Sequence, residues 1–175
     1  AVAQKTIRVS TDNTDLIMQV NNNGRLYMVY LGDKLLNASD ADRLDWTIDT
    51  GSDASVSKRG HEAYMCSGGE DFFEPALGLT HADGNKTTYL YYKDSQTKAV
   101  DGGNETVITL ADNKYDVEVR LHYVAYTKQN VIKAWSEITN KEKGDISLWK
   151  YASAILYFSS QKYFLTNYHG DWARE

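Results

Sequence analysis

Residues 115–123 read Tyr-Asp-Val-Glu-Val-Arg-Leu-His-Tyr, an unbroken alternation of apolar or aromatic side chains with polar ones. Successive side chains of an extended chain point to opposite faces, so a period of two predicts a β-strand with one buried face and one wet face. Residues 131–138 continue the pattern with bulky side chains on both faces. Residues 151–158 are almost continuously apolar, which predicts a central strand covered on both sides.

A β-hairpin is predicted near the N-terminus. Residues 15–20 and 25–31 are apolar-rich runs separated by Asn21-Asn22-Asn23-Gly24, and Asn and Gly tolerate the positive φ angles of tight turns. Turn-forming groups recur at 83–85, 101–104, 112–113 and 143–145. No segment has the pattern of a long helix. The spacing predicts an all-β, antiparallel β-sandwich, with residues 1–175 forming a single domain.

Residues 36–74 interrupt the regular alternation. Asp, Ser and Gly crowd around Trp46 and Ile48 there, and few side chains alternate. Loops of this length in a compact domain tend to be functional or to pack against a neighbour. We therefore expect a long loop region between residues 36 and 74.

Composition narrows the class of protein. The chain has 13 Tyr, 4 Trp and 4 Phe against 1 Pro, which favours strands. Its formal charge is -5 and it has no basic cluster, which argues against a nucleic-acid partner. No apolar run approaches the roughly 20 residues that span a bilayer, so we expect no membrane-spanning segment. Ala1-Val2-Ala3 resembles the small-x-small pattern of a signal-peptidase site, which favours a periplasmic or secreted bacterial protein.

Residues that carry metal or cofactor chemistry are sparse. Cys66 is the single cysteine, which excludes an internal disulfide and leaves a buried, inert thiol as a better interpretation than a catalytic one. The histidines lack the spacing of metal ligands, and His122 falls on the polar face of its strand, where a surface imidazole is expected. No nucleotide or cofactor fingerprint occurs. We therefore expect no metal site and no cofactor.

Aromatic side chains beside acidic ones are typical of sugar sites, because rings stack on the apolar C–H faces of sugars while carboxylates bond their hydroxyls. Such neighbours occur at Trp46, Phe72, Phe73 and Trp172. For each ring alone, packing in the core is the commoner role. The 24 Asp and Glu residues single out no catalytic pair.

Four segments carry a family resemblance, in order along the chain. The hairpin at 15–35 is the first. Residues 69–77 read Gly-Glu-Asp-Phe-Phe-Glu-Pro-Ala-Leu, similar to a Gly-x-Asp-Phe-x-x-Pro-Ala motif, and a turn and the strand at 89–92 follow. A strand over 130–140 ends in Thr-Asn, and residues 170–175 read Gly-Asp-Trp-Ala-Arg-Glu, similar to a closing Gly-x-Trp-x-x-Glu. Together they resemble the N-terminal domain of glycoside hydrolase family 36.

The resemblance implies a role without catalysis. Members of the family are retaining hydrolases of α-galactosides, with an N-terminal β-supersandwich, a (β/α)₈ catalytic barrel and a small C-terminal sheet domain. Both catalytic Asp residues belong to the barrel, so this chain alone should hydrolyse nothing. Its expected partners are its own catalytic barrel, further copies in a homo-oligomer and the α-galactoside substrate of the full enzyme. Residues 170–175 would mark the domain boundary, with Trp172 seated against the barrel.

The resemblance also implies two substrate-binding residues. In oligomeric relatives the segment matching 69–75 lies at or near the active-site mouth, sometimes that of a neighbouring subunit. By this carry-over Asp71 accepts hydrogen bonds from sugar hydroxyls and Phe72 walls the pocket. Phe73 stands where many members have a basic residue, and a Gly-Lys pair usual after the strand at 89–92 is missing. These departures leave room for another α-linked sugar, such as an N-acetylated galactoside.

Two other functions fit the sequence. One is a freestanding carbohydrate-binding or adhesion module, which an aromatic-rich sandwich suits equally well, since fold alone does not fix function. Micromolar binding of galactosides in calorimetry would favour that module. The other is a purely structural domain, in which Asp71 is a turn residue and Phe72 only packs.

Overall fold

The computed structural model describes residues 5–44, 62–68, 74–157, 164 and 166 of the chain. Their largest sheet has the order β5-β6-β7-β8, and every neighbouring pair is antiparallel. The strands are β5 (Leu90–Val100), β6 (Gly103–Asp112), β7 (Val117–Tyr126) and β8 (Val131–Asn140). Because strands adjacent in sequence are adjacent in space, short turns connect them, as the sequence predicts.

The predicted alternation is confirmed in β7. Val117, Val119, Leu121 and Tyr123 are buried on one face, and the side chains between them lie on the other. The strand begins later than the pattern suggests, because Tyr115 lies in the turn before it.

The N-terminal sheet has the order β1-β2-β3, with β1 (Lys5–Ser10), β2 (Thr14–Val20) and β3 (Leu26–Asp33). The predicted hairpin is formed by β2 and β3. At its turn the Gly24 amide donates to the Asn21 carbonyl at 2.9 Å, and Gly24 has a φ of 77°. Glycine adopts this left-handed conformation without steric cost.

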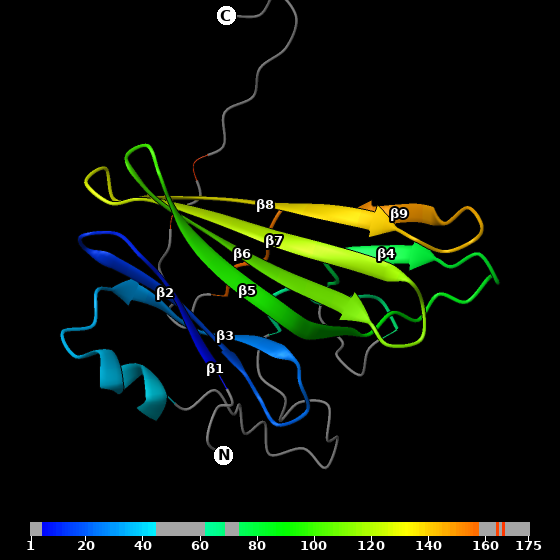
Figure 1. Cartoon of the computed structure of the whole chain (residues 1–175), viewed down its shortest axis with the longest axis horizontal. Helices are drawn as coiled ribbons and strands as arrows, with labels where there is room; N and C mark the ends of the chain where they lie inside the picture. Colours follow the sequence, from blue (N-terminus) through cyan, green and yellow to red (C-terminus); the bar gives the residue numbers. More distant parts are fainter. Residues whose placement is uncertain (1–4, 45–61, 69–73, 158–163, 165, 167–175) are drawn as a thin grey trace, which may run out of the picture.

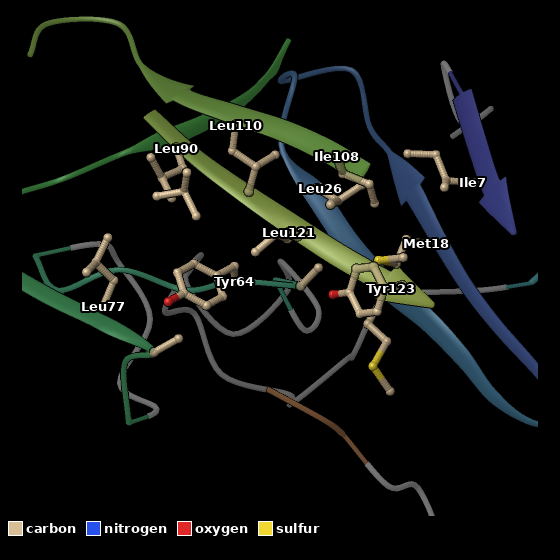
Figure 2. Close-up of a cluster of buried hydrophobic side chains, with 14 of the residues drawn as sticks. Ile7, Met18, Leu26, Tyr64, Leu77, Leu90, Ile108, Leu110, Leu121 and Tyr123 are labelled. Carbon is tan, nitrogen blue, oxygen red and sulfur yellow. The ribbon is translucent and has the colours of Figure 1, made fainter. Parts of the chain in front are cut away.

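A third sheet joins segments far apart in the chain, because β4 (Leu77–Thr80) pairs with β9 (Ser147–Tyr151) in antiparallel register. Figure 1 shows this pair beside β8, and the β1–β3 sheet packed against the four-stranded sheet. Side chains from all three sheets meet in one core, where Ile7, Met18 and Leu26 face Ile108, Leu110 and Leu121 (Figure 2). The all-β, sandwich-like fold is thus confirmed.

The predicted central strand at 151–158 is wrong. β9 ends at Tyr151, residues 152–157 form no strand, and residue 158 lies outside the described residues. The Ala152 amide donates to the Ala76 carbonyl at 2.8 Å, and its own carbonyl accepts from the Tyr64 hydroxyl at 2.8 Å. Ile155 and Tyr157 pack on the core from this irregular backbone, so burial rather than a strand ladder explains the apolar run.

The expected loop region at 36–74 is described in part. It contains the short 3₁₀ helix η1 (Ala38–Arg43) and two isolated bridges, Tyr27 with Glu62 and Cys66 with Leu77. The described residues contain no α-helix. Among them no helix is long and apolar enough to cross a bilayer.

Candidate functional site

The two predicted substrate-binding residues, Asp71 and Phe72, lie outside the described residues, which end at Gly68 and resume at Glu74. The other aromatic candidates and the predicted closing motif lie outside them as well: Trp46, Phe73, Trp172 and residues 170–175. The structure describes the residues on either side of 69–73, and these define the candidate site.

Backbone hydrogen bonds join the two sides of the 69–73 segment. The amides of Ala76 and Leu77 both donate to the Met65 carbonyl, at 2.9 and 3.2 Å, and the Ser67 amide donates to the Leu77 carbonyl at 2.8 Å. Cys66 and Leu77 are 4% and 0% exposed, so the inner end of this stem lies in the core. We call residues 65–68 and 74–77 the loop stem.

Gly68 marks the point where the stem turns away from the core. Its φ is 81°, and a Cβ at this position would lie 2.7 Å from the Thr87 Cα. Ser67 is held beside the same segment, because its hydroxyl donates to the Lys86 carbonyl at 3.1 Å and its carbonyl accepts from the Thr88 amide at 3.2 Å. Glycine is therefore required by both backbone conformation and close approach.

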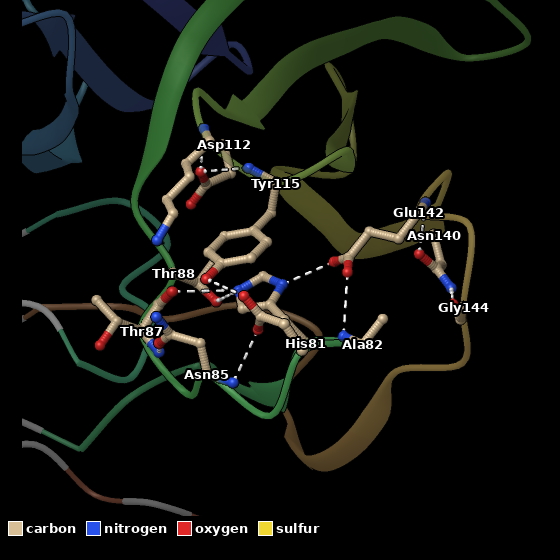
Figure 3. Close-up of polar contacts among 12 residues, drawn as sticks. His81, Ala82, Asn85, Thr87, Thr88, Asp112, Tyr115, Asn140, Glu142 and Gly144 are labelled. Carbon is tan, nitrogen blue, oxygen red and sulfur yellow. Dashed lines mark hydrogen bonds and ion pairs between the residues drawn. The ribbon is translucent and has the colours of Figure 1, made fainter.

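His81 supports the segment that touches the stem (Figure 3). Its Nδ1 lies 2.7 Å from Glu142 Oε1, and its Nε2 lies 3.1 Å from the Thr87 carbonyl and 3.0 Å from Thr88 Oγ1. The ring stacks on Tyr115, with centroids 3.5 Å apart. The imidazole is fully buried and both nitrogens are engaged, so we assign His81 a structural role.

A buried ion pair holds the chain just before the stem. Arg25 Nη2 lies 2.6 Å from Glu62 Oε2, and the guanidinium lies over the Tyr89 ring at 5.0 Å. Burial alone would lower the pKa of Arg25, but the Glu62 carboxylate raises it above its ordinary value. The next amide, of Ala63, donates to the Leu26 carbonyl at 2.9 Å. The stem is thereby tied to β3.

The outer face of the β4–β9 pair adjoins the loop stem. Leu77 and Leu79 are fully buried, so Gly78 between them faces outward. Lys150 is its cross-strand partner and therefore shares this face. Lys150 Nζ forms an ion pair with Glu74, which is the first residue of the stem's second side and directly follows 69–73. Trp149 lies against Gly78 on the same face.

A polar hollow of about 350 Å³ lies on the outer face of the four-stranded sheet. Both of its basic residues pair with neighbouring carboxylates: Lys98 Nζ lies 2.8 Å from Glu105 Oε2, and Arg120 Nε lies 3.0 Å from Glu118 Oε1, while Asp94 lines the same hollow. The pKa of both carboxyls lies below its ordinary value, chiefly because Lys98 donates a hydrogen bond to Glu105 and Lys141 donates one to Glu118. Positive and negative charges are therefore mixed at the hollow, and its electrostatic potential has no single sign.

His122 lies on this polar face, as predicted. The sequence also predicts an exposed imidazole there, and that prediction is wrong. Its side chain is 12% exposed, because the Trp135 ring from β8 stacks on it with centroids 4.6 Å apart. Its Nδ1 lies 3.0 Å from Glu105 Oε1. The alternation within β7 predicts which face His122 lies on. It does not predict that Trp135 from the neighbouring strand covers the imidazole.

The predicted buried thiol is confirmed. Cys66 is 4% exposed, and burial raises the pKa of its thiol, which keeps it protonated and unreactive at neutral pH. Among the described residues no group of three or more His, Cys, Asp and Glu side chains is arranged to hold a metal ion.

Sequence reasoning missed Trp149. Its neighbours in sequence offer no motif, and its setting depends on Gly78 from a distant strand. The available signal was a Trp that directly precedes Lys150 in a short run after the 143–145 turn. That signal does not tell an exposed ring from a buried one.

Residues 24–175 match the glycosyl hydrolase family 36 N-terminal domain. The chain belongs to this family. The resemblance inferred from the four ordered segments is therefore confirmed. A curated relative, the probable alpha-galactosidase G of Emericella nidulans, is 26% identical over an alignment of 120 positions, and the match covers 60% of this chain and 16% of that protein.

Solved structures of α-galactosidases share the fold. The α-galactosidase AgaA of Geobacillus stearothermophilus matches with a TM-score of 0.71 at 24% identity, over 86% of this chain and 24% of that one. The α-galactosidase of Lactobacillus brevis matches with a TM-score of 0.69 at 21% identity, over 88% and 24%. The galactosidase domain of AgaSK, an alpha-galactosidase-sucrose kinase, gives 0.70 at 23% identity, over 86% and 24%. The chain thus spans about a quarter of the length of these solved relatives.

Proposed function

We propose that this chain is the non-catalytic N-terminal domain of a retaining α-galactosidase-type glycoside hydrolase. It packs on the catalytic barrel and presents Asp71 and Phe72 at the active-site mouth or at an oligomer interface. Asp71 accepts hydrogen bonds from sugar hydroxyls, and Phe72 walls the pocket. The full enzyme acts on α-galactosides or closely related α-linked sugars.

The observation that carries this proposal is the double attachment of the loop stem. Hydrogen bonds from Ala76, Leu77 and Ser67 hold both sides of the 69–73 segment to one another, inside the core. Binding groups are effective when rigid elements hold them in position, because less freedom is lost on binding. A stem built in this way supports a segment that meets a ligand.

The test uses the enzyme formed when this chain is joined to its catalytic barrel. We expect Asp71→Asn to lower kcat/KM for raffinose by roughly tenfold, which corresponds to one lost hydrogen bond to a charged group. The control is Asp12→Asn, which changes an exposed carboxylate at the β1–β2 turn. Unchanged kinetics in Asp71→Asn, together with a lower melting temperature, would instead support the purely structural role.

A further inference from the structure

Trp149 occupies an unusual position in β9. Gly78 pairs with Lys150 and Leu79 pairs with Leu148, so Trp149 is the extra residue of a β-bulge. Bulges re-aim a side chain and are over-represented beside active sites. Trp149 is 52% exposed, although a residue of this size is normally well covered.

The ring lies with its face on Gly78. A Cβ built on Gly78 would meet three consecutive atoms of the indole, Cζ2, Cη2 and Cζ3, all at 2.6 Å or less. A ring that met the glycine edge-on would leave the outer two of these atoms farther away. One face of the indole therefore rests on the backbone of β4, and the exposed half of the side chain belongs to the other face.

Polar groups complete this face of the β4–β9 pair. Lys150 shares the face with Gly78 and forms an ion pair with Glu74, whose side chain is 83% exposed. An aromatic face is thus combined with an exposed carboxylate and an ammonium group. A saccharide needs this combination, because its C–H face is apolar while its hydroxyls donate and accept hydrogen bonds.

We propose that Trp149, Glu74 and Lys150 form a saccharide-binding subsite on the outer face of the β4–β9 pair. A sugar ring stacks on the free face of Trp149, and its hydroxyls bond Glu74 and Lys150. The subsite adjoins the 69–73 segment through Glu74, so it extends the proposed sugar site along the substrate. The inference rests on the proposed sugar-handling function.

Trp135 provides an internal contrast. His122 stacks on its ring at 4.6 Å, and Lys133 Nζ lies over the ring at 5.0 Å from the centroid. The two partners already occupy the surfaces that a sugar ring would need. Trp135 is therefore the matched control for Trp149.

The experiment follows the indole N–H signals of the 175-residue chain by nuclear magnetic resonance during titration with raffinose. We expect a saturable shift of the Trp149 signal at millimolar raffinose, weaker than the micromolar binding that a freestanding module would show, and no shift of the Trp135 signal. Trp149→Ala should weaken raffinose binding by about tenfold, and Trp149→Phe should retain part of the affinity because a smaller ring still stacks. Trp135→Phe should bind raffinose as the original chain does.

The Gly78→Ala variant tests whether raffinose binding depends on the position of the Trp149 ring and not on the overall fold. Its methyl group would push the indole off β4 while the tryptophan itself remains, so we expect weaker raffinose binding with a retained near-native circular dichroism spectrum. The inference is overturned if raffinose leaves the Trp149 signal unshifted, or if Trp149→Ala binds raffinose unchanged. It is also overturned if the Trp149 signal responds to protein concentration instead of sugar, which would assign this face to a second copy.

The two proposals fail in different measurements. A Trp149 signal that shifts with raffinose supports the subsite even where Asp71→Asn leaves the kinetics unchanged, since the loop assignment alone is then lost. An unshifted Trp149 signal overturns the subsite even where Asp71→Asn lowers kcat/KM.

Discussion

Two glycines with nearly the same backbone conformation differ in what surrounds them. Gly68 has a φ of 81°, and Gly84 has a φ of 86°. A Cβ on Gly68 would lie 2.7 Å from the Thr87 Cα, whereas a Cβ on Gly84 would meet nothing within 4 Å. A residue with a Cβ would pay the cost of the left-handed conformation at both positions. Only at position 68 would its Cβ also meet another part of the backbone.

We expect Gly84→Ala to lower the free energy of unfolding by about 1 kcal/mol, the ordinary cost of this conformation for a side chain. Gly68→Ala should lower it by about 3 kcal/mol or more, because Thr87 must also move. Urea denaturation of the two variants measures the difference. Equal losses would mean that Gly68 and Thr87 are not in close contact.

For single residues, the sequence predicted backbone conformation better than it predicted contacts between side chains of distant segments. The Asn21-Asn22-Asn23-Gly24 run predicts a tight turn, and Gly24 has the positive φ that suits one. Neither the Thr87 contact nor the stacking of Trp135 on His122 could be predicted, since both join separate segments. The roles of Asp71 and Phe72 remain predictions.

Asp15, in β2, links this strand to β1 and to the chain that follows β3. Its carboxylate is fully buried and accepts from Arg8 Nε at 3.0 Å, from Ser10 Oγ at 2.5 Å and from the Leu35 amide at 2.8 Å. These groups come from β1 and from the chain after β3. Burial alone would raise the pKa of Asp15, but the bonds from Arg8, Ser10 and Leu35 together lower it below its ordinary value.

Because the pKa of Asp15 is lower in the folded chain, the free energy of unfolding depends on pH in the acidic range. A carboxyl whose pKa is lower in the folded chain stabilises it above the unfolded pKa, about 3.9, and loses that contribution as pH falls through the folded value. We expect Asp15→Asn to cost about 2 to 4 kcal/mol at pH 7 and to flatten the decline below pH 4. Thermal unfolding between pH 2 and pH 7 measures both, with exposed Asp101→Asn as control. An unchanged acid slope in Asp15→Asn would contradict the assignment.

Elements were predictable where pairing is local. The hairpin and the strands of the large sheet join neighbours in sequence, so turn residues and alternation sufficed to predict them. The β4–β9 pair joins distant segments, and an apolar run cannot by itself tell a strand from irregular buried chain. Residues 151–158 were misread for this reason.

At the scale of the whole molecule, the described residues leave apolar surface uncovered. A second hollow, of about 240 Å³, lies between the sheets, and its lining includes Leu16, Leu31, Ile132 and Leu156. Leu156 is 48% exposed at this site. Such surface is typical of domains that pack on a neighbour. The chain spans about a quarter of its solved relatives, so a neighbouring domain is the expected cover under the proposed function.

We expect the native chain to bind the apolar dye anilinonaphthalene sulfonate at this hollow, and Leu156→Ser to reduce the dye fluorescence. Leu148→Ser is the matched control, because Leu148 is equally exposed, at 48%, but does not line the hollow. In the enzyme formed by joining the chain to its barrel, fluorescence per chain should fall, since the barrel covers the apolar lining. Equal fluorescence in the two proteins would show that the hollow stays open and that the barrel packs elsewhere on the domain.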